Sequence, residues 1–160
     1  MKWITRERPK VDRLACAWLI HRFIDQEPDF LFVPREQVLA GAERFGAIPY
    51  DVPGVELGHS GPLCSFDAFL VRYHLDDPAL KRMAQIVRGV DTHYPDLAAE
   101  TSGLKAVVLG LNANIADDME LVVRSRPMYD ALYAWCDRLV RPPLGILGGI
   151  ARLFMKGKPR

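Results

Sequence analysis

The stretch PKVDRLACAWLIHRFID, residues 9–25, does most to decide the fold of this 160-residue chain. Its apolar side chains recur every three or four residues, the spacing of one buried helical face: Val11, Leu14, Ala15, Trp18, Leu19 and Phe23. Pro9 suits the first turn of a helix, where its missing N–H is not needed. We therefore predict a helix from about residue 9 to about residue 25.

Short apolar segments on both sides of this helix are typical of strands. Residues 3–5 precede it, and residues 30–33 lie between two prolines. Residues 36–45 have helical spacing and end at Gly46, a residue suited to closing a helix. Residues 47–52 then read as another short strand. The first third of the chain thus predicts short strands separated by helices.

The rest of the chain is mainly helical in pattern. A turn-rich loop, PGVELGHSGP, covers residues 53–62. Ser65 can cap the helix that follows, and Asp77 can cap another that begins at Pro78. The periodic pattern of that second helix ends near Pro95.

Two further helices are predicted, over about residues 102–111 and about 117–139, and the proline pair at 142–143 stops the second. The fold class is therefore predominantly α-helical α+β, a single compact domain with a few short strands packed by helices. We assign residues 1–141 to that domain. Residues 142–160 form a tail, expected to be a short docked helix with a basic end.

Composition narrows the class of protein. Apolar residues make up 49% and charged residues 26%, which is typical of a globular domain. The net charge of +1 provides no general attraction to nucleic acid. Three separated cysteines without CxxC spacing indicate a reducing compartment. The charged N-terminus and the lack of a long apolar run predict a cytoplasmic protein without a membrane span.

His59 is the first candidate for chemistry, because it lies in the turn-rich loop directly after a predicted strand. Asp51, Glu56 and Asp67 are close to it in sequence. Imidazole nitrogen and carboxylate oxygen together suit a divalent ion such as manganese, iron or zinc. Alternatively, His59 hydrogen-bonds only the backbone of its own turn.

Two aspartates at helix ends are the other candidates. Asp91 falls at the C-terminal end of a predicted helix, where the helix dipole disfavours a carboxylate unless a cation compensates. Either Arg88 or a metal ion could be that cation. Asp12 lies near a helix N-terminus, where the dipole alone would favour its charge. It shares a helix face with Cys16.

Several enzyme signatures are missing. The sequence has neither a GxxxxGK[ST] phosphate loop nor a GxSxG motif, and no nucleotide cofactor is indicated. Cys64 remains a candidate for redox chemistry, although a cysteine in an apolar setting is usually a small buried side chain.

Eight segments together resemble the C-terminal domain of ChrB-type chromate-resistance proteins. In chain order they are WITR (3–6), VDRLACAWLIHRFID (11–25), FLFVP (30–34), GAIPYDVPGVELGH (46–59), CSFDAFL (64–70), IVRGVDT (86–92), PDL (95–97) and YDALYAWC (129–136). The resemblance implies a role in bacterial chromate or oxidative-metal tolerance and a functional link to a chromate transporter.

The order of Asp12, His59 and Asp91 is also similar to Asp-His-His phosphoesterases, whose corresponding residues hold manganese. That family pairs two histidines, whereas this chain has one at position 59. This likeness implies a single-metal site built from Asp12, His59 and Asp91, with Glu56 as a further ligand.

The leading hypothesis is a metal-binding or metal-responsive accessory protein of chromate resistance, with Asp12, Glu56, His59 and Asp91 as ligands. A metal ion or an oxyanion is the expected small partner. One alternative is a metal-dependent enzyme, either a hydrolase or a redox protein acting on chromate or superoxide. Another is a regulatory module in which the basic segment from Arg6 to Arg13 contacts DNA or a protein. The sequence does not fix the catalytic residues or the oligomeric state.

Overall fold

The computed structural model describes residues 1–91 and 97–142. Three parallel strands form its sheet: β1 (Lys2–Arg6), β2 (Asp29–Val33) and β3 (Ile48–Pro49), in the order β2-β1-β3. Trp3 in the central strand is in register with Phe30 on one side and Ile48 on the other. All three strands therefore end at the same edge of the sheet.

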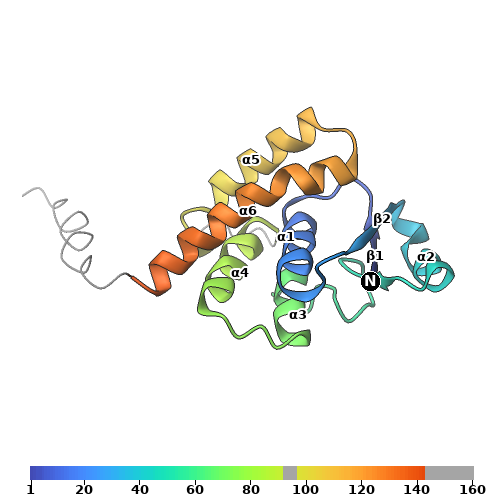
Figure 1. Ribbon diagram of the computed structural model, residues 1–160, viewed down its shortest axis with the longest axis horizontal. Helices are drawn as coiled ribbons and strands as arrows, with labels where there is room; N and C mark the ends of the chain where they lie inside the picture. Colours follow the sequence, from blue (N-terminus) through green and yellow to red (C-terminus); the bar gives the residue numbers. More distant parts are fainter. Residues whose placement is uncertain (92–96, 143–160) are drawn as a thin grey trace, which may run out of the picture.

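The two faces of β1 are covered by different helices because successive strand side chains point in opposite directions. Trp3 is buried in the main core with α1 (Val11–Leu19). Ile4 is buried on the other side, in a smaller core with α2 (Val38–Phe45). Figure 1 shows α1 and α2 on opposite sides of the strands. A sheet covered on both faces is typical of parallel strands.

The remaining helices extend the main core away from the sheet. They are α3 (Ser65–Arg72), α4 (Pro78–Asp91), α5 (Thr101–Asn114) and α6 (Asp118–Val140). In Figure 1, α1 lies between the sheet and the group of α4, α5 and α6. Tyr129 of α6 is fully buried, and its hydroxyl donates to the Val11 carbonyl oxygen over 2.8 Å. The predicted α+β class with mainly helical content is confirmed.

The local predictions for the first third of the chain hold with changes at element ends. The first helix begins at Val11, and its last part is a π-helical turn, η1 (Ile20–Ile24). The helix predicted over residues 36–45 is a 3₁₀ turn, η2 (Arg35–Gln37), followed by α2. Gly46 closes α2 with a left-handed φ of 61°.

The predicted strand over residues 47–52 is wrong in extent, because only Ile48 and Pro49 form it. Pro49 has no N–H to donate to a ladder. Asp51 adopts a left-handed φ of 54°, which turns the chain away from the sheet.

Ser65 was expected to cap α3, but the capping position is occupied by Cys64, whose backbone is extended. The Asp67 carboxylate accepts the Cys64 N–H over 3.1 Å, so the cap is supplied three residues further along. The Ser65 hydroxyl instead donates to Asp51 over 2.9 Å. Asp77 does act as predicted, accepting the Ala79 N–H over 2.8 Å.

α5 is longer than predicted, α6 lies within one residue of its predicted bounds, and Pro127 lies inside α6 without ending it. α4 is described as far as Asp91, and the predicted end near Pro95 lies outside the described residues, as does the tail from residue 143 onward. Within residues 1–91 and 97–142, no helix combines the length and the apolar character needed to cross a membrane.

Candidate metal centre

His59 lies among three carboxylates that come from separate parts of the fold. Its Nε2 is 3.4 Å from Asp12 Oδ2, 3.2 Å from Asp51 Oδ1 and 3.0 Å from Asp91 Oδ2. Asp12 belongs to the first turn of α1, Asp51 follows β3, and Asp91 is the last residue of α4. The loop over residues 53–62 carries His59 to the point where these elements meet.

Asp12 is buried, with 2% of its side chain exposed, yet its carboxylate is well provided with donors. Oδ2 accepts the Ser65 N–H over 2.8 Å, and Oδ1 accepts the Phe66 N–H over 3.0 Å. The Cys16 thiol also faces Oδ1, at 3.7 Å. The positive N-terminal ends of α1 and α3 therefore both stabilise the charge of Asp12.

Asp51 is equally buried but is held by cations. Its Oδ2 lies 2.7 Å from Arg6 Nη2 and 3.1 Å from Arg13 Nε. Burial alone would raise the pKa of Asp51, but hydrogen bonds from His59 and Arg6 outweigh it and bring that pKa below its usual value. Asp51 is thus a carboxylate already neutralised within the fold, placed to orient His59.

Asp91 is the carboxylate of the group whose ionised form is least stabilised by its surroundings. Burial, reinforced by the negative charge of Asp12, raises the pKa of Asp91 to about 6. Its position at the C-terminal end of α4 adds to this cost. The sequence offered Arg88 as a possible partner for Asp91. The Nε of Arg88 lies 3.8 Å from Asp67.

The carboxylates act on His59 in the opposite direction. Hydrogen bonds to Asp12 and Asp51 raise the pKa of His59 to about 10. A proton on its imidazole therefore balances the neighbouring negative charge near neutral pH. One ligand atom from each of Asp12, His59 and Asp91 lies within 4.8 Å of the others, a cluster suited to a single cation.

Glu56 does not join this group, although the sequence grouped it with His59. Its side chain is 71% exposed, and its Oε1 lies 3.0 Å from Arg72 Nε. Asp51 takes the nearer place beside His59. Its position just after a strand was the one sequence signal that pointed to it, because the ends of strands frequently carry site residues.

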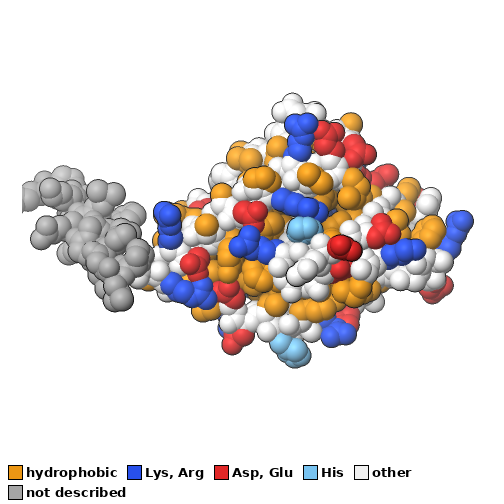
Figure 2. Space-filling view, viewed as in Figure 1, with side chains coloured by type: hydrophobic (Ala, Val, Ile, Leu, Met, Phe, Trp, Pro, Cys, Tyr) orange, Lys and Arg blue, Asp and Glu red, His pale blue; other side chains and the backbone are white. Residues whose placement is uncertain are grey.

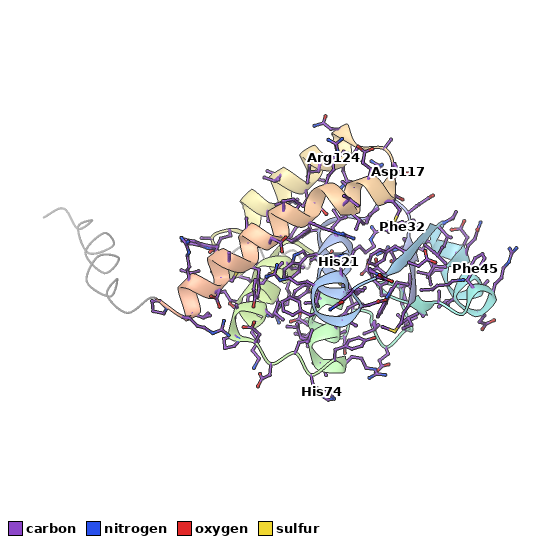
Figure 3. All side chains as sticks on the ribbon, viewed as in Figure 1. His21, Phe32, Phe45, His74, Asp117 and Arg124 are labelled. Atoms are coloured by element: carbon purple, nitrogen blue, oxygen red, sulfur yellow. The ribbon has the colours of Figure 1, made fainter. Side chains whose placement is uncertain are left out.

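The other candidate side chains lie in different settings. Cys64 is buried, and burial, with the charge of Asp12, raises the pKa of its thiol, which disfavours the reactive thiolate. His21 lies on η1 and His74 follows α3, and Figure 3 shows His74 at the edge of the molecule, away from His21. Neither contributes to the cluster around His59.

Comparison with known proteins gives the family. A family model described as the C-terminal domain of ChrB matches residues 3–136. The protein named ChrB from Cupriavidus metallidurans strain CH34 is 35% identical over 133 residues, covering 82% of this chain and 40% of that protein. The chain thus spans about two fifths of the length of this relative. No solved structure matches the chain. The family match extends over α1 to most of α6 and includes every residue of the cluster, so the chain belongs to the ChrB C-terminal domain family.

Proposed function

We propose that this domain binds one divalent metal ion through Asp12, His59 and Asp91, and that it serves as a metal-binding or metal-responsive accessory protein in chromate resistance. The observation that carries the proposal is the convergence of one nitrogen and two oxygen ligands, within 4.8 Å of one another, from three separate elements. The setting of chromate resistance rests on membership of the ChrB family.

The charges around the cluster support a divalent ion. Arg6 and Arg13 pair with Asp51, and the carboxylates of Asp12 and Asp91 both lie close to His59 Nε2. An ion of charge +2 could replace the proton of His59 and balance both carboxylates. Manganese, iron and zinc accept this mixture of imidazole and carboxylate ligands.

Metal content and titration test the proposal directly. Protein treated with a chelator and dialysed is titrated with Mn²⁺, Fe²⁺ under anaerobic conditions, and Zn²⁺. We expect one ion to bind per chain, and His59→Ala to weaken binding by at least about tenfold because one of three ligands is lost. His74→Ala is the matched control, because His74 lies outside the cluster. Equal titrations for His59→Ala and the unmodified protein would overturn the assignment.

The alternative of DNA binding through the basic segment has less support. Arg6 and Arg13 pair with Asp51, and Arg8 donates to the carbonyl oxygens of Asn112, Ile115 and Ala116. These arginines thus serve contacts within the fold. Acidic and basic side chains are also interspersed over the face shown in Figure 2, which gives that face no strongly basic patch.

A further inference from the structure

A cavity of about 420 Å³ opens directly beside the candidate metal centre. His59 and Asp51 form part of its wall, so it adjoins the cluster. Its remaining lining combines two arginines with a short loop: Arg6, Arg35, Val52, Pro53 and Gly54. A cavity lined partly by residues of a candidate metal centre is well placed to bind a ligand of that centre.

The position of this cavity follows from the order of the strands. The chain passes from central β1 to β2 on one side, and later reaches β3 on the other side. At such a change of direction, the loops after the strands separate and leave a crevice at their carboxyl ends, where ligands bind in open α/β sheets. Arg6 ends β1, Arg35 follows β2, and Asp51 follows β3.

The arginines of the cavity retain unused donors. Arg35 is exposed, and its guanidinium has no hydrogen-bond or ion-pair partner among the described residues. Arg6 uses Nη2 to bind Asp51, while its buried Nε has no partner in the part of the chain that the structure describes. A buried donor without a partner is unfavourable in proteins generally, which favours an acceptor at this point.

The net charge of the cavity is positive. Asp51 is its one acidic lining residue, and its oxygens face Arg6, Arg13, Ser65 and His59. Among the described residues, no carboxylate pairs with the guanidinium of Arg35. Guanidinium groups present planar sets of N–H donors that match the paired oxygens of an oxyanion.

We propose that this cavity binds a small tetrahedral oxyanion of charge −2, held between Arg6 and Arg35 beside the metal centre. The inference rests on the proposed function because it supplies the ligand of the same site. It commits to the shape and charge that chromate, sulfate and hydrogen phosphate share. The role of Arg35 is to contact the anion together with Arg6, the other arginine that lines the cavity.

The test is a binding titration of the full chain with sulfate, phosphate and chromate, each in separate experiments, with nitrate at equal ionic strength as the monovalent control. Each titration is run in the presence of a chelator and again after loading with Mn²⁺. Arg35→Ala removes the free guanidinium, and Arg44→Ala is the matched control. Both variants lose one positive charge, but Arg44 lies on α2 and does not line the cavity.

We expect saturable binding of at least one dianion, weakened about tenfold by Arg35→Ala and unchanged by Arg44→Ala. Arg35→Lys should recover only part of the loss, because an ammonium group lacks the planar donor set. The relative affinities of the three dianions then identify which of them the cavity prefers. No saturable binding, or equal binding by Arg35→Ala and the unmodified protein, would overturn the proposal.

The two proposals fail in different ways. If the metal titrations fail while the dianion still binds metal-free protein through Arg35, the metal assignment falls and the anion cavity stands. If metal binds but no dianion does, the anion cavity falls alone.

Discussion

At His59 a proton and the proposed metal ion would compete for the same nitrogen. The raised pKa of about 10 means that its imidazole is protonated across the neutral range in metal-free protein. A coordinating imidazole must be neutral, so binding has to release that proton.

We therefore predict that apparent metal affinity rises by about tenfold for each unit of pH between roughly pH 6.5 and 8.5. Below the pKa of Asp91, about 6, protonation of a second ligand should steepen the fall. The sign follows because lower pH favours the proton in both groups. Calorimetry in buffers of different ionisation enthalpy should show release of about one proton per ion near pH 7.5. An affinity that does not change with pH would contradict this arrangement.

We expect the charge of Asp91 to favour metal binding and to destabilise the metal-free protein. Since its folded-state pKa is raised, the folded protein binds the proton more tightly than the unfolded chain, and stability falls as pH rises through about 4 to 6. Asp91→Asn should raise the free energy of unfolding of metal-free protein at pH 7 by up to about 1 kcal/mol. The same substitution should weaken metal binding.

Urea unfolding of both proteins in the presence of a chelator checks the prediction for Asp91. Asp76→Asn, a change of the same kind at an exposed carboxylate outside the cluster, is the control. A clear loss of stability in Asp91→Asn would show that its charge is balanced in the fold better than we infer.

Part of the candidate site could be predicted residue by residue. Asp91 at a helix end and His59 in a loop rich in glycine each carry a local signal that sequence alone displays. Asp51 has only its position after a strand as a signal, and nothing in the sequence shows that it lies nearer to His59 than Glu56 does, because that depends on side-chain directions set when the chain folds. The left-handed backbone at Asp51 turns its side chain toward His59, whereas Glu56 pairs with Arg72.

At the scale of elements, helix ends show how local sequence determines structure. Asp117 precedes α6, and its Oδ1 accepts the Glu120 N–H over 2.7 Å. An aspartate in this position satisfies a backbone donor that the helix leaves unpaired.

Asp117→Ala should lower the free energy of unfolding by about 1 kcal/mol, with metal binding unchanged because α6 carries no proposed ligand. Chemical denaturation measures the effect. Glu43→Ala, on the exposed side of α2, serves as the comparison and should change stability by less than about 0.5 kcal/mol. Equal stabilities of the two variants would show that this cap contributes nothing.

The helices were predictable because their apolar spacing is repeated over several turns. The extent of β3 was not predictable, because the strand expected over residues 47–52 is limited to two residues by Pro49 and the turn at Asp51. The π-helical turn η1 was also beyond prediction from periodicity. It widens the last turns of a segment whose spacing reads as continuous α-helix.

At the scale of the whole molecule, Arg8 joins the sheet end to the far helices. Its guanidinium donates to the carbonyl oxygens of Asn112, Ile115 and Ala116 at 2.7 to 3.1 Å, where α5 ends. A cation at that end also complements the helix dipole.

Arg8→Ala should therefore lower the free energy of unfolding by about 1 to 2 kcal/mol. Arg8→Lys should recover part of the loss because it keeps the charge. Thermal and urea unfolding provide the measurement, and Arg44→Ala is the control for loss of a surface arginine. If Arg8→Ala unfolded like Arg44→Ala, the link between β1 and α5 would be energetically unimportant.

The order of the strands was not contained in any local pattern. Periodicity identifies strands but gives neither their neighbours nor their direction, which depend on contacts between residues far apart. The cavity between Arg6 and Arg35 depends on that order, and so no sequence signal pointed to it.

The hydrogen bonds from Ser65 and Phe66 to Asp12 span more than fifty positions of the chain. They impose a sequence of events on synthesis at the ribosome. While the N-terminal strand and the first helix emerge, only the N-terminal end of its own helix stabilises the carboxylate of Asp12. Its remaining donors, the N–H groups of Ser65 and Phe66, arrive with the third helix. Asp91 follows later still. For the proposed metal site, a cation that met the nascent chain before that point would find an incomplete set of ligands, so tight binding would require the finished domain.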